Sequence, residues 1–120
     1  MKNFIGGVLI CLGIALGFFT FGCSGETILD ANTIYFFTKP GCPYCEKAED
    51  YIKQMHPTLS VEYKNVKEVS ARNLMLACAE KFNLPTNQLG TPLICMGDNH
   101  ILGWGPKAPD QFERALKAMK

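Results

Sequence analysis

Apolar residues change their spacing several times beyond residue 31, and each change marks an expected element. Thr33–Thr38 is a run of β-branched and aromatic residues, which is typical of a buried strand. Pro43–Met55 has apolar residues at helical spacing, and Pro43 suits a first helical turn because its missing N–H would be unpaired there anyway. The inward face of this helix is expected to hold Ala48, Tyr51, Ile52 and Met55.

The next stretch predicts a second strand and a second helix. Val61–Val66 has strand composition, and Ser70 is expected to cap a helix that ends near Phe82. Asn83–Gly90 is expected to be a polar turn. The inward face of the second helix is expected to hold Ala71, Leu74, Met75, Cys78 and Phe82.

The last third predicts a hairpin and a closing helix. Pro92–Met96 is a short apolar strand, Gly97–Asn99 has the composition of a turn, and His100–Leu102 is the expected partner strand. Pro109 and Asp110 are suited to the start of a helix. Its inward face is expected to hold Phe112, Ala115, Leu116 and Met119.

The order β-α-β-α-β-β-α predicts an α/β fold, with a mixed four-stranded sheet and helices on both of its faces. A parallel pair is expected around the first helix and an antiparallel hairpin at the end. In open sheets of this kind chemistry gathers at the carboxyl ends of the strands, which is where Cys42 falls.

The N-terminal residues look like a targeting segment that precedes this domain. A basic start is followed by the uncharged apolar run Phe4–Gly22, which is the layout of a secretory signal. The run is also nearly long enough to cross a membrane, so cleaved signal, retained anchor and lipoprotein signal with lipidation at Cys23 stay open. We expect residues 1–24 to be this segment, residues 25–120 to be one domain, and the domain to lie outside the cytoplasm, in a bacterial periplasm and anchored to a membrane.

Charge adds little about partners. The 120 residues carry 12 Lys and Arg against 11 Asp and Glu, a net charge of +1, and the two signs are interspersed. Nucleic-acid binding needs a concentrated basic face, so it is not expected.

The strongest chemical signal is Cys42-Pro43-Tyr44-Cys45 at a helix start. Unpaired N–H groups and the helix dipole favour a thiolate at Cys42, which is therefore the expected nucleophile. Cys45 lies one turn on, where it can attack a mixed disulfide and release the substrate. Lys39 is a candidate supporting cation, and a solvated loop charge is the alternative.

Two other uses of the cysteines stay open. A zinc site would need further ligands from Cys78, Cys95, His56 and His100, none of which forms a second close pair, so no metal is expected. Cys78 and Cys95 are candidates for a structural disulfide, with two buried free thiols as the alternative. His56 and His100 have no partner nearby in sequence, so solvated or capping roles are expected.

The motifs TKPGCPYC after a strand, GTP before another and a Gly-Asp hairpin resemble those of the glutaredoxins and glutaredoxin-like thioredoxins over Thr33–Met119. The resemblance implies a thioredoxin-like fold and a cis-proline at Pro92, which would free the backbone of Thr91 to pair with substrate. A trans edge-strand proline is the alternative. Pro43 and Tyr44 would support the active site. Trp104 would offer an apolar wall for substrate, or serve the core.

The expected function is thiol-disulfide exchange on protein disulfides, without a cofactor, with an unidentified dithiol as donor. Glutathione-using glutaredoxins carry a Gly-Gly and paired acidic residues after the last hairpin. Gly103–Asp110 resembles instead the segment of redoxins served by thioredoxin reductase, which argues against glutathione. A disulfide oxidant or isomerase, and a non-catalytic metal-binding or partner-docking module, are the alternatives, because direction depends on a reduction potential that the sequence does not fix.

Overall fold

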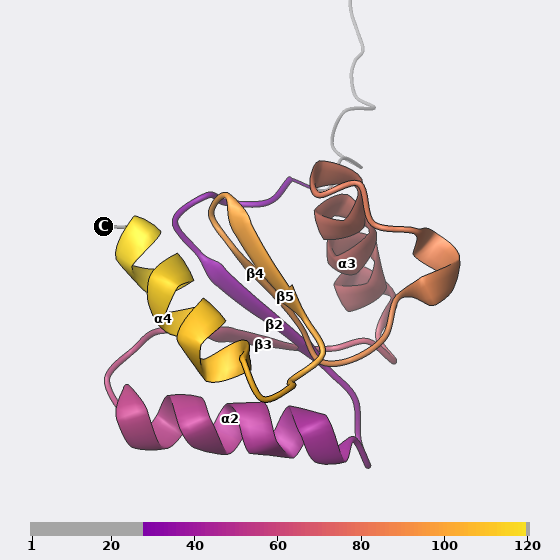
Figure 1. The fold of residues 1–120 in the computed structure, drawn as a ribbon. Coiled ribbons are helices and arrows are strands. Elements are labelled where there is room, and N and C mark those ends of the chain that lie inside the picture. The colour runs from indigo at the N-terminus through magenta and orange to yellow at the C-terminus, as the bar shows by residue number, and fades with distance from the viewer. Residues whose placement is uncertain (1–27, 120) are drawn as a thin grey trace, which may run out of the picture.

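The computed structural model describes residues 28–119, so the expected leader, the boundary at residue 25 and Cys23 lie outside the described residues. The elements alternate along the chain as predicted, and Figure 1 shows their arrangement. They are β2 (Ile34–Thr38), α2 (Pro43–Met55), β3 (Glu62–Asn65), α3 (Val69–Lys81), the 3₁₀ helix η3 (Thr86–Gln88), β4 (Leu93–Met96), β5 (Asn99–Leu102) and α4 (Ala108–Ala118). None of the helices between residues 28 and 119 has the length and apolar character needed to cross a membrane.

One mixed sheet holds the four strands in the order β3-β2-β4-β5. Strand β2 runs parallel to β3 and antiparallel to β4, and β4 pairs antiparallel with β5. The predicted fold class, with its parallel pair and closing hairpin, is confirmed. Strand β2 lies inside the sheet, between β3 and β4. Its carboxyl end is followed by a short loop and the start of α2.

Alternate residues of the central strands face two separate apolar clusters, one on each side of the sheet. Phe36 and Ile94 point to the side covered by α2 and α4, where Phe112 is fully buried. Phe37 and Leu93 point to the opposite side, which α3 covers (Figure 1). The sheet therefore carries a helical layer on both faces, and the N-terminus of α2 lies in the first cluster.

The start of α3 differs from the prediction. The helix begins at Val69 after Glu68, so Ser70 lies inside it and is not its cap, and no side chain caps this end. A turn closed by the Glu68 N–H on the Asn65 carbonyl, at 3.0 Å, brings the chain into helical geometry earlier than Ser70. The backbone turn, which the cap pattern did not reveal, sets the boundary.

Two smaller predictions were also wrong. Met55 is 60% exposed, because it is the last residue of α2 and the chain turns away at His56. Asn99 pairs with Met96 in the hairpin register, so the turn is confined to Gly97 and Asp98. The polar connection Asn83–Gly90 lies where it was expected and contains one turn of 3₁₀ helix, η3.

Candidate active site

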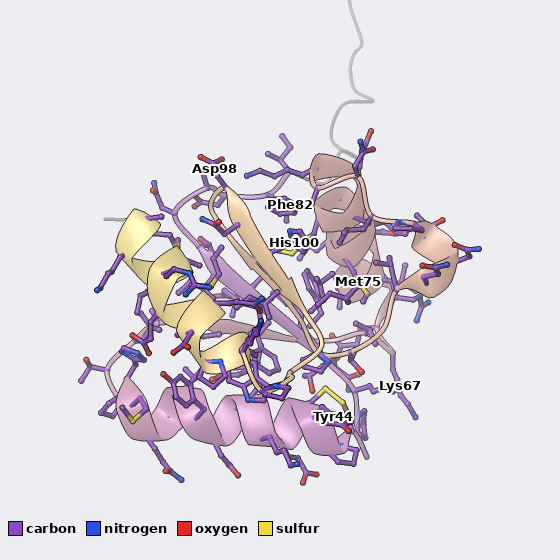
Figure 2. The ribbon with its side chains drawn as sticks, viewed as in Figure 1. Tyr44, Lys67, Met75, Phe82, Asp98 and His100 are labelled. Atoms are coloured by element: carbon purple, nitrogen blue, oxygen red, sulfur yellow. A yellow bond between two sulfur atoms is a disulfide. The ribbon has the colours of Figure 1, made fainter. Side chains whose placement is uncertain are left out.

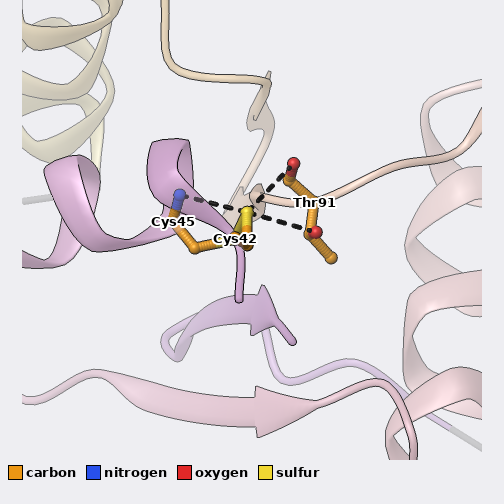
Figure 3. Close-up of a disulfide and its surroundings, with 3 residues drawn as sticks. All are labelled: Cys42, Cys45 and Thr91. Atoms are coloured by element: carbon orange, nitrogen blue, oxygen red, sulfur yellow. Dashed lines mark hydrogen bonds between the residues drawn. A yellow bond between two sulfur atoms is a disulfide. The ribbon is translucent and has the colours of Figure 1, made fainter. Parts of the chain in front are cut away.

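The loop between β2 and α2 places Cys42 at the N-cap of the helix. Gly41 adopts a φ of +75°, which a side chain would disfavour, and Cys42 follows in an extended conformation. The sulfur of Cys42 accepts a hydrogen bond from the backbone N–H of Cys45, at 3.2 Å (Figure 3). Sulfur therefore occupies the position of a capping side-chain acceptor, at the positive end of the helix dipole.

Cys42 and Cys45 are joined by a disulfide, with their Cα atoms 5.2 Å apart. The two residues differ in exposure: Cys42 is 6% exposed and Cys45 only 2%. An attacking or attacked sulfur needs an approach from solvent, and Cys42 is the less buried of the two.

Thr91 reaches the same sulfur from across the site. Its hydroxyl Oγ1 lies 3.5 Å from Cys42 Sγ, which it can reach as a donor, and its carbonyl oxygen lies 3.6 Å from that atom (Figure 3). The peptide bond between Thr91 and the buried Pro92 is cis. Within residues 28–119 the N–H of Thr91 has no backbone acceptor, whereas the Pro92 carbonyl accepts from Gly103 at 2.8 Å. An unpaired stretch of backbone thus lies beside the reactive sulfur.

Tyr44 and Trp104 form an open groove next to these groups. Tyr44 is exposed at the N-terminal end of α2, beside the active-site disulfide (Figure 2). One pocket of about 300 Å³ is lined by Tyr44, Thr91 and Trp104, and a second of about 450 Å³ continues past Tyr44 and Trp104 to Lys47 and Pro106. The groove has aromatic walls and a single cation at its far end.

Trp104 belongs both to this groove and to the core. Its ring is half-buried and packs at 5.6 Å from Tyr51 and 6.5 Å from Phe112. Trp104 therefore has the core role that was one alternative from the sequence, and its role as a wall for substrate stays a prediction.

A further pocket of about 300 Å³ lies beside the disulfide and against α2. Lys39, Cys42 and Cys45 line it together with Glu49 and with Asn65 of β3. Lys39 is exposed at its mouth. The cation expected to support the active site is therefore close to both cysteines, although it forms no ion pair among the described residues.

Comparison with known proteins decides the family. The glutaredoxin family model matches residues 34–101, which include Cys42, Cys45 and Thr91. The chain belongs to the glutaredoxin family. With the Cys-x-x-Cys pair in place at the helix start, it is a thiol oxidoreductase, as predicted.

Solved structures agree with this fold, and a search of curated proteins gave no match. The chain is similar to a thioredoxin-like protein at 20% sequence identity and a TM-score of 0.51, over 69% of this chain and 99% of that one. A glutaredoxin from buckwheat in complex with glutathione is 21% identical over 73% of this chain and 76% of that chain, with a TM-score of 0.46.

A second disulfide in this glutaredoxin lies away from the first. Cys78 of α3 and Cys95 of β4 are joined, with their Cα atoms 6.5 Å apart, within the usual range for a disulfide. Both residues are buried in the cluster on the α3 side of the sheet. The sequence left open a structural disulfide or two buried free thiols, and the structure has the disulfide.

The histidines have the expected roles, since His100 is exposed and His56 is a C-cap, but both also contact other side chains. His100 packs its ring 4.7 Å from that of Phe82, and the two lie side by side in Figure 2. His56 takes the C-cap position of α2, and its Nε2 lies 2.7 Å from Oε2 of Glu113 on α4. The carboxylate was missed from the sequence because it lies 57 positions away.

Tyr51 completes this cluster at the α2–α4 contact. Its hydrogen bond to Glu113, followed by burial, raises the pKa of Tyr51 to about 12. The same bond, followed by that of His56, lowers the pKa of Glu113. Since Tyr51 also packs against Trp104, the cluster supports the back of the groove that Trp104 lines.

No group of three or more His, Cys, Asp or Glu side chains within residues 28–119 is placed to hold a metal ion. His56 and His100, the histidines considered as zinc ligands, are engaged with Glu113 and Phe82.

Proposed function

We propose that this glutaredoxin is an extracytoplasmic enzyme that exchanges disulfides with protein substrates, with Cys42 as the nucleophile and Cys45 as the resolving thiol. The observation that carries the proposal is the position of Cys42 Sγ, which lies at the N-terminus of α2 in contact with the Cys45 N–H and the Thr91 hydroxyl. Both donors favour a thiolate over a thiol at this atom.

The reaction proceeds in two exchanges. The Cys42 thiolate attacks one sulfur of the substrate disulfide, a mixed disulfide forms, and the other substrate sulfur leaves as a thiolate. Cys45 then attacks the Cys42 sulfur, which forms the bond seen in the structure and releases the second substrate thiol. An external dithiol reduces the pair again, so that the substrate gains two electrons and the donor loses them.

A protein substrate suits the surroundings of Cys42. The unpaired N–H of Thr91 and its carbonyl, 3.6 Å from Cys42 Sγ, can pair with an extended chain in the manner of strand addition. The groove between Tyr44 and Trp104 then receives an apolar side chain next to the substrate cysteine. Lys47, over the Tyr44 ring at 5.4 Å, gives the groove a basic end.

We infer that the donor is a dithiol other than glutathione, since Gly103–Asp110 lacks the paired acidic residues that would hold the tripeptide's amino end. The expected signal or lipoprotein leader supports placement in the periplasm at a membrane.

The test is turnover of a protein disulfide by the purified protein supplied with dithiothreitol. Wild type should reduce it, and Cys42→Ser should abolish turnover because no other cysteine of residues 28–119 is the N-cap of a helix. The double variant Cys78→Ala and Cys95→Ala serves as the matched control, since it removes both sulfurs from the opposite face of the sheet and leaves no unpaired thiol there. Turnover by Cys42→Ser would refute the assigned nucleophile. The reduction potential of the pair, measured against a dithiol buffer, would distinguish a reductant from an oxidant.

A further inference from the structure

Cys45 has a proton to lose before it can resolve the mixed disulfide. The thiolate is the nucleophile in thiol-disulfide exchange, and Cys45 is only 2% exposed. Its backbone N–H points to Cys42 Sγ, so the hydrogen bonds that favour a thiolate serve the first sulfur. The second sulfur needs a separate route by which its proton leaves the core.

The pocket against α2 provides such a route. Cys45 and Glu49 both line it, and its volume of about 300 Å³ leaves room for several waters at about 30 Å³ each. Residues four apart on a helix lie on one face, so Cys45 and Glu49 face the pocket from successive turns of α2. The Glu49 side chain is 33% exposed. The wall of the pocket thus holds both a buried thiol and a partly exposed carboxylate.

Lys53 holds Glu49 in place. Its Nζ lies 2.6 Å from Oε2 of the carboxylate, one further turn along α2. Among the contacts of residues 28–119, Oε1 has no protein partner and can accept from a water. The hydrogen bond to Glu49 raises the pKa of Lys53, which keeps the ammonium charged beside the carboxylate.

We propose that Glu49 accepts the proton of Cys45, through a water in this pocket, as Cys45 attacks the mixed disulfide. This rests on the proposed function. In the step, the Cys45 S–H electron pair forms the bond to Cys42 Sγ and the bond from Cys42 Sγ to the substrate sulfur breaks. The substrate leaves as a thiolate, and the proton passes to the carboxylate and then to solvent. No external oxidant or reductant is needed.

Other charged groups line the same pocket, and their effects on Cys45 must be distinguished from that of Glu49. Glu46 is an acid at the same end of α2, but it follows Cys45 directly and so does not share its face. Lys39 is the cation among the lining residues, and Asn65 from β3 is neutral. Glu46→Gln and Glu49→Gln remove the same charge near the same sulfurs, which makes them a matched pair.

The experiment follows a coloured aromatic disulfide mixed with the fully reduced protein in a stopped-flow instrument. The first exchange at Cys42 releases one aromatic thiolate, and resolution by Cys45 releases the second, so the two steps appear as two phases of absorbance. Glu49→Gln should leave the first phase unchanged and slow the second by about tenfold or more at neutral pH, the low end of general-base effects. Glu46→Gln should leave both phases unchanged.

The pH profile separates proton transfer from a structural effect. In Glu49→Gln, the rate of the second phase should rise about tenfold per pH unit, because hydroxide and water then remove the proton of Cys45. Glu49→Asp should restore part of the wild-type dependence of this rate on pH. Equal slowing by Glu46→Gln and Glu49→Gln would reduce the effect to simple charge and overturn the assignment, as would an unaltered second phase in Glu49→Gln. Absence of the first phase in wild type would instead refute the proposed function.

Discussion

Tyr51 of α2 donates its hydroxyl hydrogen to Oε2 of Glu113 on α4 across 2.6 Å, and this bond closes the contact between the two helices that lie on one face of the sheet. His56 approaches the same oxygen from the end of α2. One carboxylate therefore serves two groups of the active-site helix, and its charge state decides how firmly α4 is held.

The first prediction concerns acid stability. The folded pKa of Glu113 is lowered by the bonds from Tyr51 and His56, so its contribution is present above the unfolded value of 4.5 and is lost as pH falls through the folded pKa. Glu113→Gln should lower stability at neutral pH by at most about 1 kcal/mol, because the site is partly exposed. Thermal unfolding should show this difference shrinking below pH 4.5. Glu80→Gln, exposed on α3, should show neither effect, and equal behaviour of the two would contradict the prediction.

The second prediction concerns trapping of substrate. Cys45→Ser should leave the first exchange intact and accumulate a mixed disulfide through Cys42, since the resolving sulfur is gone. Cys42→Ser removes the sulfur at the helix N-cap, so the 2% exposed Cys45 should trap little. Mass spectrometry of alkylated, non-reduced extracts would measure both and identify the substrate. Equal trapping by the two variants would sink the assigned order of attack.

The third prediction concerns the disulfide between Cys78 and Cys95. Replacing both by Ala should cost about 3 kcal/mol of unfolding free energy, because the bond closes a long chain segment. The pair Cys42→Ser and Cys45→Ser should cost less, since it opens a much shorter loop. Denaturant unfolding gives both values. Alkylation of Cys78 and Cys95 themselves, located by peptide mass spectrometry of the unfolded and non-reduced wild-type protein, would exclude the bond.

The fourth prediction concerns Cys23. If the leader is a lipoprotein signal, a labelled fatty acid should enter the wild-type protein in cells and should not enter Cys23→Ala. Cys11→Ala is the matched control, because it changes a cysteine within the leader and leaves Cys23 in place. Recovery of wild type and Cys23→Ala alike in a soluble periplasmic fraction would rule out lipidation.

Much of the fold was predictable because its signals are local. Helix α2 runs from Pro43 to Met55 as the apolar spacing and the proline predicted, and the central strands are recognisable by their unbroken apolar composition. The position of Cys42 followed from the order of strand, glycine turn and helix. A local sequence pattern is sufficient to predict an element when the residues that stabilise the element are close together in the sequence.

The rest depends on contacts between distant segments. No residue near His56 in the sequence indicates that Glu113 will contact it. Likewise, no residue near Cys45 indicates that Asn65 of β3 will complete a pocket lined by Cys45 and Glu49. The start of α3 followed a backbone turn at Asn65 that outweighed the capping preference of Ser70. Such features arise when elements pack together, so they are absent from any single window of the sequence.

The two sulfur pairs occupy opposite faces of one sheet, Cys42 with Cys45 beneath α2 and Cys78 with Cys95 beneath α3. For the Cys42 thiolate to attack the other bond, a layer of fully buried side chains such as Phe36 and Phe37 would have to part first. The sheet therefore keeps the Cys42 sulfur physically separated from the Cys78–Cys95 disulfide. The Cys42–Cys45 pair can therefore pass through repeated cycles of oxidation and reduction while the Cys78–Cys95 crosslink of the core stays intact.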